Sequence, residues 1–324
     1  MRAVTTAGER VGVDCAVPKL ASLLDAGTGG ELAAASAAGE TVHLEVQADR
    51  RPFRRDGWAM IGRDAWASPP RALIVDACSS GFDLLIEPRG GTLHVAARYR
   101  PAPATRGANI LLASRFRLLA AQTLLHYPAL WWASRHGRVP LHVSVTSCAD
   151  EVTMIAGPGG VGKSTLLSAG LARGEIATAD NVCACDPHTA FGLVEPLRVQ
   201  GAPGGPAAPH GRSEVPLPGR VPSLEPDRLV VLRRGTTGER TVVQPLSPDE
   251  AARELVAGTY MAGELRRFWP FAATLALATG IGPAHPDVSG VATALAARLP
   301  CVEVRVADGS PAPIGELLRM AGAT

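Results

Sequence analysis

Lysine is almost absent from this chain of 324 residues. Only Lys19 and Lys163 are lysines, which leaves 30 of the 32 Lys and Arg residues as arginine. Abundant arginine and alanine are typical of a GC-rich genome, so most of the arginines carry no functional signal. Composition does not explain a lysine at position 163, and that position needs a chemical reason.

Paired cysteines are missing as well. None of the six cysteines belongs to a C-x-x-C pair, which most zinc and redox frameworks contain. Cys183 and Cys185 alternate with Ala184 and are expected on one face of a strand. Buried thiols that act as small hydrophobic side chains are the expectation for this pair.

The sequence predicts neither a leader nor a membrane span. Residues 1–10 contain no continuous apolar segment of the kind a signal peptide needs. The longest weakly polar stretch, residues 271–284, is too short to cross about 30 Å of hydrocarbon. A net charge of +2 gives no global attraction to nucleic acid or anionic membranes. We therefore expect a cytoplasmic protein with reduced thiols and with neither nucleic acid nor membrane as partner.

The chain is long enough for two domains, and 46% hydrophobic residues are enough to build their cores. Residues 1–110 are predicted to form an N-terminal α+β domain with a strand at 42–46, a short apolar run at 71–76 and a hairpin at 82–98. Residues 114–136 have helical spacing, interrupted at Pro128, and their aromatic side chains favour a domain seam over a ligand platform.

Residues 111–324 are predicted to form an α/β domain with a mostly parallel sheet. Short apolar strands at 141–146, 152–156, 176–179, 229–232 and 241–243 alternate with helical segments such as 164–173. Ser247 and Glu250 have the spacing of a capping box at the start of a further helix. Residues 201–226 are rich in Pro and Gly, which indicates a solvated linker or a mobile flap.

A phosphate-binding loop follows the strand at 152–156. Residues 157–164 read GPGGVGKS and match G-x-x-x-x-G-K-[ST] between a strand and a helix. Glycines let the backbone curl so that successive N–H groups point at one anion, and the helix adds its positive end. Lys163 can reach the β- and γ-phosphates, Ser164 can hold Mg²⁺, and Thr165 can support the α-phosphate. The predicted nucleotide-binding residues are Gly157, Gly159, Gly160, Val161, Gly162, Lys163, Ser164 and Thr165.

A phosphate site of this kind also needs an acid at the end of a neighbouring strand. Asp180 follows the predicted strand at 176–179 and is seventeen residues after Lys163. It could hold the magnesium shell or accept the proton of an attacking hydroxyl. His142 begins the strand before the loop strand, and on the residues alone it favours a structural role.

These residues together resemble the catalytic core of HPr kinase/phosphorylase, which shares a P-loop fold with phosphoenolpyruvate carboxykinase. His142 precedes Gly157 by fifteen residues, and Asp180 occupies the first position of the Asp-Asp pair of that family. Segments 195–199, 229–234 and 244–251 look like the small HPr-kinase-like enzymes of metabolite and peptide gene clusters. The resemblance covers roughly residues 112–320 and leaves residues 1–110 without a match.

The resemblance implies a kinase that uses ATP or another nucleoside triphosphate together with Mg²⁺. It implies catalytic roles for Asp180, His142 and Lys163, and magnesium ligands at Ser164 and Asp180. Asn181 replaces the second Asp of the pair. Asn181 and Arg198 are predicted to bind the substrate, with Arg198 as a clamp for an anionic group. The segment that recognises a protein substrate in the family is only weakly similar to residues 194–198 of this chain.

The expected acceptor is therefore a hydroxyl of a small metabolite or biosynthetic peptide. A protein serine kinase of the HPr type is one alternative, and a nucleotide-binding regulator or NTPase that transfers to water is another. The sequence identifies neither the acceptor nor the preferred base of the donor. It also leaves the oligomeric state open, a homo-oligomer included.

Overall fold

The computed structural model describes residues 1–35, 39–148, 151–200, 207–208, 211–235, 241–306 and 313–320. The chain divides into two compact units. Unit 1 contains Met1–Gly137, Pro203–Glu214 and Arg267–Pro286, and unit 2 contains Arg138–Ala202, Val215–Arg266 and Asp287–Thr324. None of the helices in the described ranges combines the length and apolarity needed to cross a bilayer.

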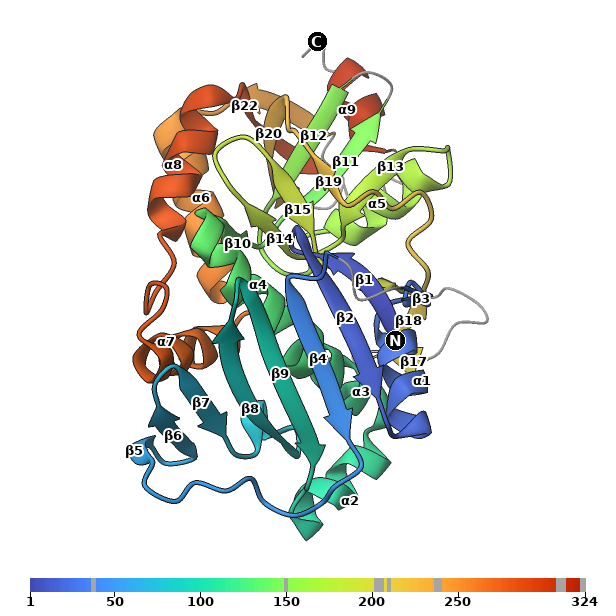
Figure 1. The fold of residues 1–324 in the computed structure, drawn as a ribbon. Coiled ribbons are helices and arrows are strands. Elements are labelled where there is room, and N and C mark those ends of the chain that lie inside the picture. Colours follow the sequence, from blue (N-terminus) through green and yellow to red (C-terminus); the bar gives the residue numbers. More distant parts are fainter. Residues whose placement is uncertain are drawn as a thin grey trace. The chain divides into compact units, whose positions relative to one another are not determined.

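Unit 1 is built on a nine-stranded mixed sheet (Figure 1). Its order is β3 (Ala33–Ala34), β1 (Arg2–Thr6), β2 (Glu9–Cys15), β4 (Val42–Gln47), β9 (Thr92–Tyr99), β8 (Phe82–Arg89), β7 (Arg71–Ile74), β6 (Ala65–Ser68) and β5 (Ala59–Gly62). β4 runs parallel to β2 and β9. The expected hairpin is confirmed as β8 and β9, which turn at Gly90 and Gly91, both with positive φ.

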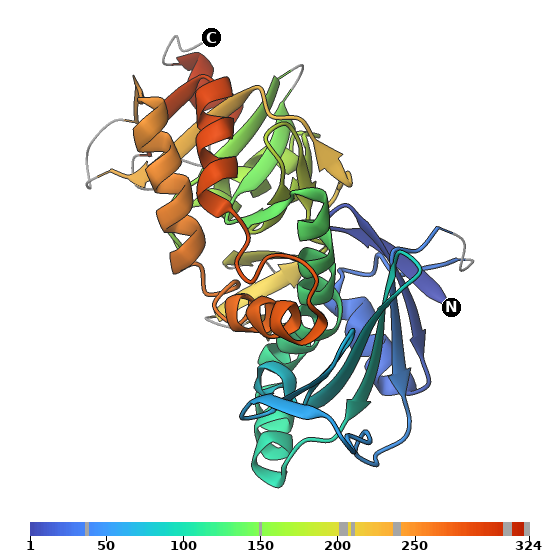
Figure 2. The same cartoon turned by 60° about the vertical axis from the view of Figure 1, so that its left-hand side comes forward.

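Helices pack on this sheet as Figures 1 and 2 show. α1 (Pro18–Gly27), α4 (Tyr127–Ala133) and α7 (Phe268–Thr279) contact its strands, and α3 (Ala113–Ala121) packs with α1 and with α2 (Pro103–Leu111). Tyr127 of α4 lies 5.8 Å from Phe268 and 5.9 Å from Phe271 of α7, measured between ring centroids. Unit 1 also contains β17 (Ala207–Ala208), which pairs with β18 (Arg212–Val215). The aromatic side chains of α4 thus form part of the core of unit 1.

Pro128 does not break the helical run in which it lies. Residues Gln122–His126 form one π-helical turn between α3 and α4, and Pro128 lies in the first turn of α4. Proline has no N–H to donate and its ring needs space near the carbonyl four residues earlier, which a wider turn provides. The helices therefore follow one another without the interruption that the sequence suggested.

The boundary between the units differs from the predicted one at residues 110 and 111. α3 and α4 belong to unit 1, because α4 packs on β2, β4 and β9 of the nine-stranded sheet. The apolar side chains of residues 114–136 take part in that packing. The first boundary therefore falls at Gly137, and α7 joins unit 1 from far along the sequence.

Unit 2 contains a six-stranded sheet and a smaller antiparallel one. The larger sheet has the order β13 (Ile176–Ala179), β11 (Ser144–Cys148), β12 (Glu151–Ala156), β20 (Arg228–Arg234), β22 (Cys301–Val306) and β21 (Val242–Pro245). The smaller one has the order β10 (Val139–Leu141), β14 (Cys183–Cys185), β15 (Ala190–Gly192) and β19 (Ser223–Leu224). Only β12–β20 and β20–β22 are parallel pairs, so the sheet predicted as mostly parallel is mixed.

The helices of unit 2 cover the six-stranded sheet. They are α5 (Lys163–Leu171), α6 (Pro248–Met261), α8 (Val288–Arg298) and α9 (Ile314–Met320). α6 packs beside α8 (Figure 2) and contacts β12, β20 and β22, whereas α5 packs with α9. Leu166 of α5 shares a buried cluster with Ile155 and Val230 of the sheet. This packing anchors the helix that follows the phosphate loop.

Residues 211–226 of the segment expected to be a solvated linker or a mobile flap contain regular structure. These residues include β18 and β19, and Leu217 is buried against Leu167 and Leu171 of α5 and Leu197 of β16 (Leu197–Gln200). Apolar side chains placed between the prolines and glycines allow this packing. Residues 201–206 and 209–210 of the segment lie outside the described residues.

The cap of α6 yields a stability prediction. Ser247 accepts a hydrogen bond from the Glu250 amide, and the Glu250 side chain accepts from the Ser247 amide, which confirms the predicted capping box. Ser247→Ala should lower the free energy of unfolding by about 1 kcal/mol because it leaves an orphan amide at the helix start. Ser289→Ala, at an exposed position of α8, is the control and should change it by less than about 0.5 kcal/mol. Equal urea midpoints for the two variants would contradict this assignment.

Candidate functional site

The strand directions in unit 2 bring the predicted functional residues to one edge of the sheet. β11 is antiparallel to both β12 and β13, so β12 and β13 run the same way, and β20 is parallel to β12. The carboxyl ends of β12, β13 and β20 therefore meet at the edge where β11 begins. The phosphate loop follows β12, Asp180 follows β13, and His142 precedes β11 at this edge.

The loop conformation depends on glycine at three positions. Gly157, Gly160 and Gly162 have φ values of +145°, +78° and +115°, which side chains with a Cβ rarely adopt. A Cβ on Gly157 would also lie 2.6 Å from the carbonyl oxygen of Leu232 on β20. Gly162 is the N-cap of α5, so the loop leads directly into the N-terminal end of that helix, where its first backbone N–H groups lie.

Lys163 points back into the loop. Its ammonium donates to the carbonyl oxygens of Gly157 at 2.8 Å and Pro158 at 3.3 Å, and the residue is 5% exposed. Burial lowers the pKa of Lys163 to about 8, against the opposing charges of Asp180 and Glu264. At neutral pH the side chain still carries its proton. It offers a positive charge inside the curl of backbone that a phosphate chain would occupy.

Ser164 and Asp180 form the second polar element of the site. The Ser164 hydroxyl donates to Oδ2 of Asp180 at 2.9 Å, and Asp180 is 1% exposed. The Ser144 hydroxyl donates to the backbone carbonyl of Asp180, which ties the end of β13 to the start of β11. The strand-end position of Asp180 is therefore held from two sides.

The Ser164 hydroxyl and the Asp180 carboxylate are the kinds of ligand that the protein contributes to Mg²⁺ in a P-loop site. Mg²⁺ takes oxygen ligands and draws most of them from phosphates and water, with a hydroxyl and a carboxylate from the protein. In the described part of the chain, no group of three or more His, Cys, Asp or Glu side chains is placed to hold a metal ion. A hydroxyl and one carboxylate in contact fit the donor set of Mg²⁺.

His142 lies in the break between β10 and β11, rather than inside the single strand predicted for 141–146. Its amide donates to the Thr259 hydroxyl at 3.1 Å instead of joining a sheet, and this contact keeps the two strands separate. Burial, and after it the charge of Lys163, lower the pKa of His142 to about 4. The imidazole is therefore neutral at pH 7, and its Nδ1 has no hydrogen-bond partner in the described part of the structure.

A buried polar network extends from Asp180. The Asn181 amide donates to Asp180 Oδ2 at 3.3 Å and to Glu195 Oε1 at 3.1 Å. Arg198 donates to Glu195 at 2.9 Å and lies 3.5 Å from Glu264. The structure thus brings Asn181 and Arg198 to the same cluster as Asp180, with the Arg198 guanidinium engaged by two carboxylates.

Burial and charge set the protonation of this network. Burial raises the pKa of Glu195 to about 7, against the lowering effect of Arg198. Burial alone would lower the pKa of Arg198, but Glu195, Glu264 and Asp180 together raise it. Glu195 and Glu264 were not among the predicted site residues. The three-residue spacing of Glu195 and Arg198 could have indicated Glu195, whereas no local sequence pattern indicates Glu264.

The remaining loop residues have simpler environments. Val161 packs on the buried cluster around Ile155, which fixes the side of the loop next to the sheet. Thr165 lies exposed in the first turn of α5, and its amide donates to the Gly162 carbonyl at 3.0 Å. Gly159 faces open space. All of the predicted site residues lie in unit 2.

Comparison with known proteins adds one distant likeness. No family model and no curated protein matches the chain. One match among solved structures is the Hpr(Ser) kinase/phosphatase from Coxiella burnetii, with 17% sequence identity over 33% of this chain and 76% of that chain. The TM-score of this match is 0.24, too low to carry an argument about fold or function.

The glycine geometry of the loop gives the next prediction. Gly157→Ala should lower the free energy of unfolding by about 1–3 kcal/mol because φ is +145° and the new Cβ would meet the Leu232 carbonyl. Gly159→Ala is the matched control, since a Cβ there meets nothing within 4 Å. Urea unfolding of both variants checks the difference. Similar losses at the two glycines would show that the loop does not need its Gly157 conformation.

Proposed function

We propose that this chain is an ATP- and Mg²⁺-dependent kinase that transfers a terminal phosphoryl group to a hydroxyl. The observation that carries the proposal is the contact of Ser164 with Asp180 at 2.9 Å beside a glycine loop that encloses the Lys163 ammonium. A loop of N–H groups, a lysine, a hydroxyl and a carboxylate are the parts that a P-loop phosphotransferase uses.

Each side chain has a defined task in this proposal. Lys163 exchanges the carbonyls of Gly157 and Pro158 for phosphate oxygens, which its charge binds more strongly. Asp180 accepts the proton of the acceptor hydroxyl, and neutral His142 presents an unprotonated nitrogen in the same region. Magnesium, held by Ser164 and Asp180 when bound, would supply charge that offsets the negative charge of the phosphates.

The acceptor is proposed to be a hydroxyl of a small metabolite or biosynthetic peptide. The burial of Asn181 and Arg198 in the same polar cluster as Asp180 supports this acceptor, because polar side chains there would orient it. A protein serine kinase and an NTPase that uses water are the rival functions. Nucleotide consumption that rises only when an acceptor is added separates a kinase from an NTPase, and acceptor screens with labelled ATP make that measurement.

Lys163 provides the first test of the proposal. Lys163→Ala should reduce phosphoryl transfer by at least about 10²-fold, because one cation in a buried electrostatic site contributes several kcal/mol to the transition state. Lys19→Ala, which removes the other lysine at an exposed position of α1, is the control. Circular dichroism establishes that both variants are folded. Wild-type turnover in a folded Lys163→Ala variant would remove this lysine from the chemistry.

Asp180 provides the second test. Asp180→Asn keeps the size and some hydrogen bonding but removes the proton acceptor, so the single-turnover rate should fall by about 10²–10⁴-fold. Nucleotide affinity should change much less, because the loop amides and Lys163 supply most of the binding. If Asp180 acts mainly on the metal, affinity for Mg·ATP falls together with the rate and excess Mg²⁺ partly restores both.

The measurement is the single-turnover rate beside ATP affinity at two magnesium concentrations. Asp56→Asn is the control, because Asp56 lies on the surface of unit 1 with 80% of its side chain exposed. A near-normal rate for Asp180→Asn would exclude this carboxylate as the base and leave His142 as the next group to test.

A further inference from the structure

A pocket of about 470 Å³ opens beside the phosphate loop. Loop residues 158–161 form one wall, the end of β20 forms another, and α6 forms the third. Gly258 of α6 faces the loop, and a Cβ there would lie at van der Waals distance, 3.7 Å, from the Gly157 carbonyl oxygen. The volume lies within the range of small-molecule sites, about 300–1,000 Å³.

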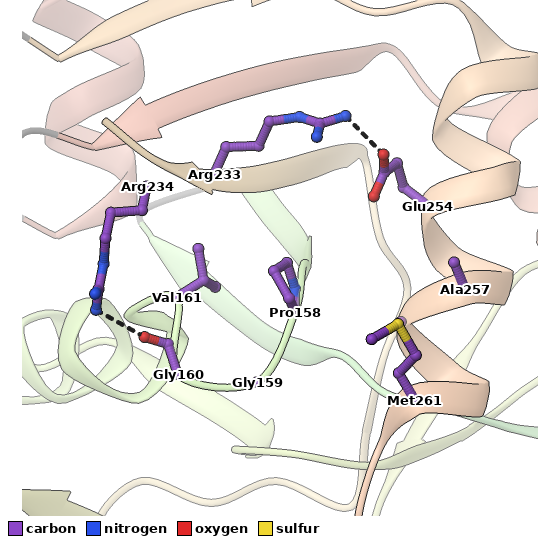
Figure 3. Close-up of a pocket in the computed structure, with 10 residues that line it drawn as sticks. Pro158, Gly159, Gly160, Val161, Arg233, Arg234, Glu254, Ala257 and Met261 are labelled. Atoms are coloured by element: carbon purple, nitrogen blue, oxygen red, sulfur yellow. Dashed lines mark hydrogen bonds and ion pairs between the residues drawn. The ribbon is translucent and has the colours of Figure 1, made fainter. Parts of the chain in front are cut away.

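The pocket wall combines charged and apolar groups, as Figure 3 shows. Arg233 extends from β20 to Glu254 of α6, with 2.6 Å between Nη2 and Oε1. Arg234 donates from Nη2 to the Gly160 carbonyl at 3.0 Å and so joins β20 to the loop. Met261 of α6 is 81% exposed, a large apolar side chain left open to solvent on the pocket rim.

The strand order separates this pocket from the proposed chemistry. β11 and β13, with His142 and Asp180 at their ends, lie on one side of β12, whereas β20 lies on the other. None of Asp180, His142 or Arg198 lines the pocket. If the terminal phosphoryl group of a nucleotide in the loop faces Asp180, as the proposed function requires, the side of the loop left for the nucleoside is that of β20 and α6.

We propose that the pocket between the phosphate loop, β20 and α6 binds the nucleoside of the phosphoryl donor. This inference rests on the proposed function and specifies where the donor is recognised. The Glu254 carboxylate accepts hydrogen bonds from the ribose hydroxyls, which are donors without charge. The base packs on Met261 and on the planar guanidinium of Arg234. The loop contact of Arg234 positions that group next to the phosphates.

The test fills the pocket from a position that faces solvent. Ala257 lines the pocket and is exposed on α6, so Ala257→Trp adds a ring there without displacing core residues. It should weaken Mg·ATP binding by at least about tenfold, because the nucleoside loses its apolar contacts and hydrogen bonds. Binding of magnesium tripolyphosphate, which has the phosphates and no nucleoside, should stay within about twofold of wild type. Isothermal titration measures both affinities.

Three further variants sharpen the result. Glu254→Gln should weaken ATP but not tripolyphosphate, and Glu225→Gln, at an exposed position outside the pocket, should change neither. Arg253→Trp adds the same ring to an exposed position of α6 that does not line the pocket, and it should bind ATP like wild type.

Three outcomes would overturn the inference. Unchanged ATP affinity in Ala257→Trp would show that the nucleoside does not bind in this pocket. If acceptor-dependent turnover were lost in the same variant, the pocket would instead be the binding site of the acceptor. Equal losses for ATP and tripolyphosphate would make the pocket part of the phosphate site. A wild-type protein that binds neither ligand would instead refute the proposed function, and the inference with it.

Discussion

A positive charge held almost out of water is the constraint on which the site depends. Lys163 is 5% exposed, and its pKa falls to about 8 although two loop carbonyls accept its hydrogen bonds. A buried ammonium is tolerated only with hydrogen bonds and a nearby opposite charge. Asp180 and Glu264 supply that charge, and Glu264 in turn lies beside Arg198. The loop conformation and the charged cluster are therefore parts of one electrostatic arrangement.

The parts of this arrangement that are close in sequence could be predicted. The Gly157–Ser164 motif, the strand before it and the helix after it follow from local patterns, and the structure contains all of them as β12, loop and α5. Asp180 was also predictable, because a short strand that runs in the direction of β12 ends just before it. In each case the information lies in the motif itself or in the strand and helix next to it.

The missing parts depend on pairings that a local pattern does not encode. β11 separates β12 from β13 and runs antiparallel to both, so the sheet is mixed, although the alternation of strands and helices suggested a mostly parallel one. Glu264 follows α6 and reaches Arg198 across 66 positions of sequence. The boundary of unit 1 depends on α7 packing with α4, two helices that lie far apart in the chain. Tertiary packing decides each of these features.

The asparagine at position 181 is explained by the carboxylates around it. The Asn181 amide donates to both Asp180 and Glu195, and the charge of Asp180 is one of the influences that raise the pKa of Glu195. An aspartate at 181 would add a third acid to two whose charges already disfavour each other, and it could not donate the two hydrogen bonds of the amide. The amide instead links the two acids by hydrogen bonds and leaves its own oxygen as an acceptor. A single carboxylate next to Ser164 is then compatible with a second one buried nearby, because the amide separates them.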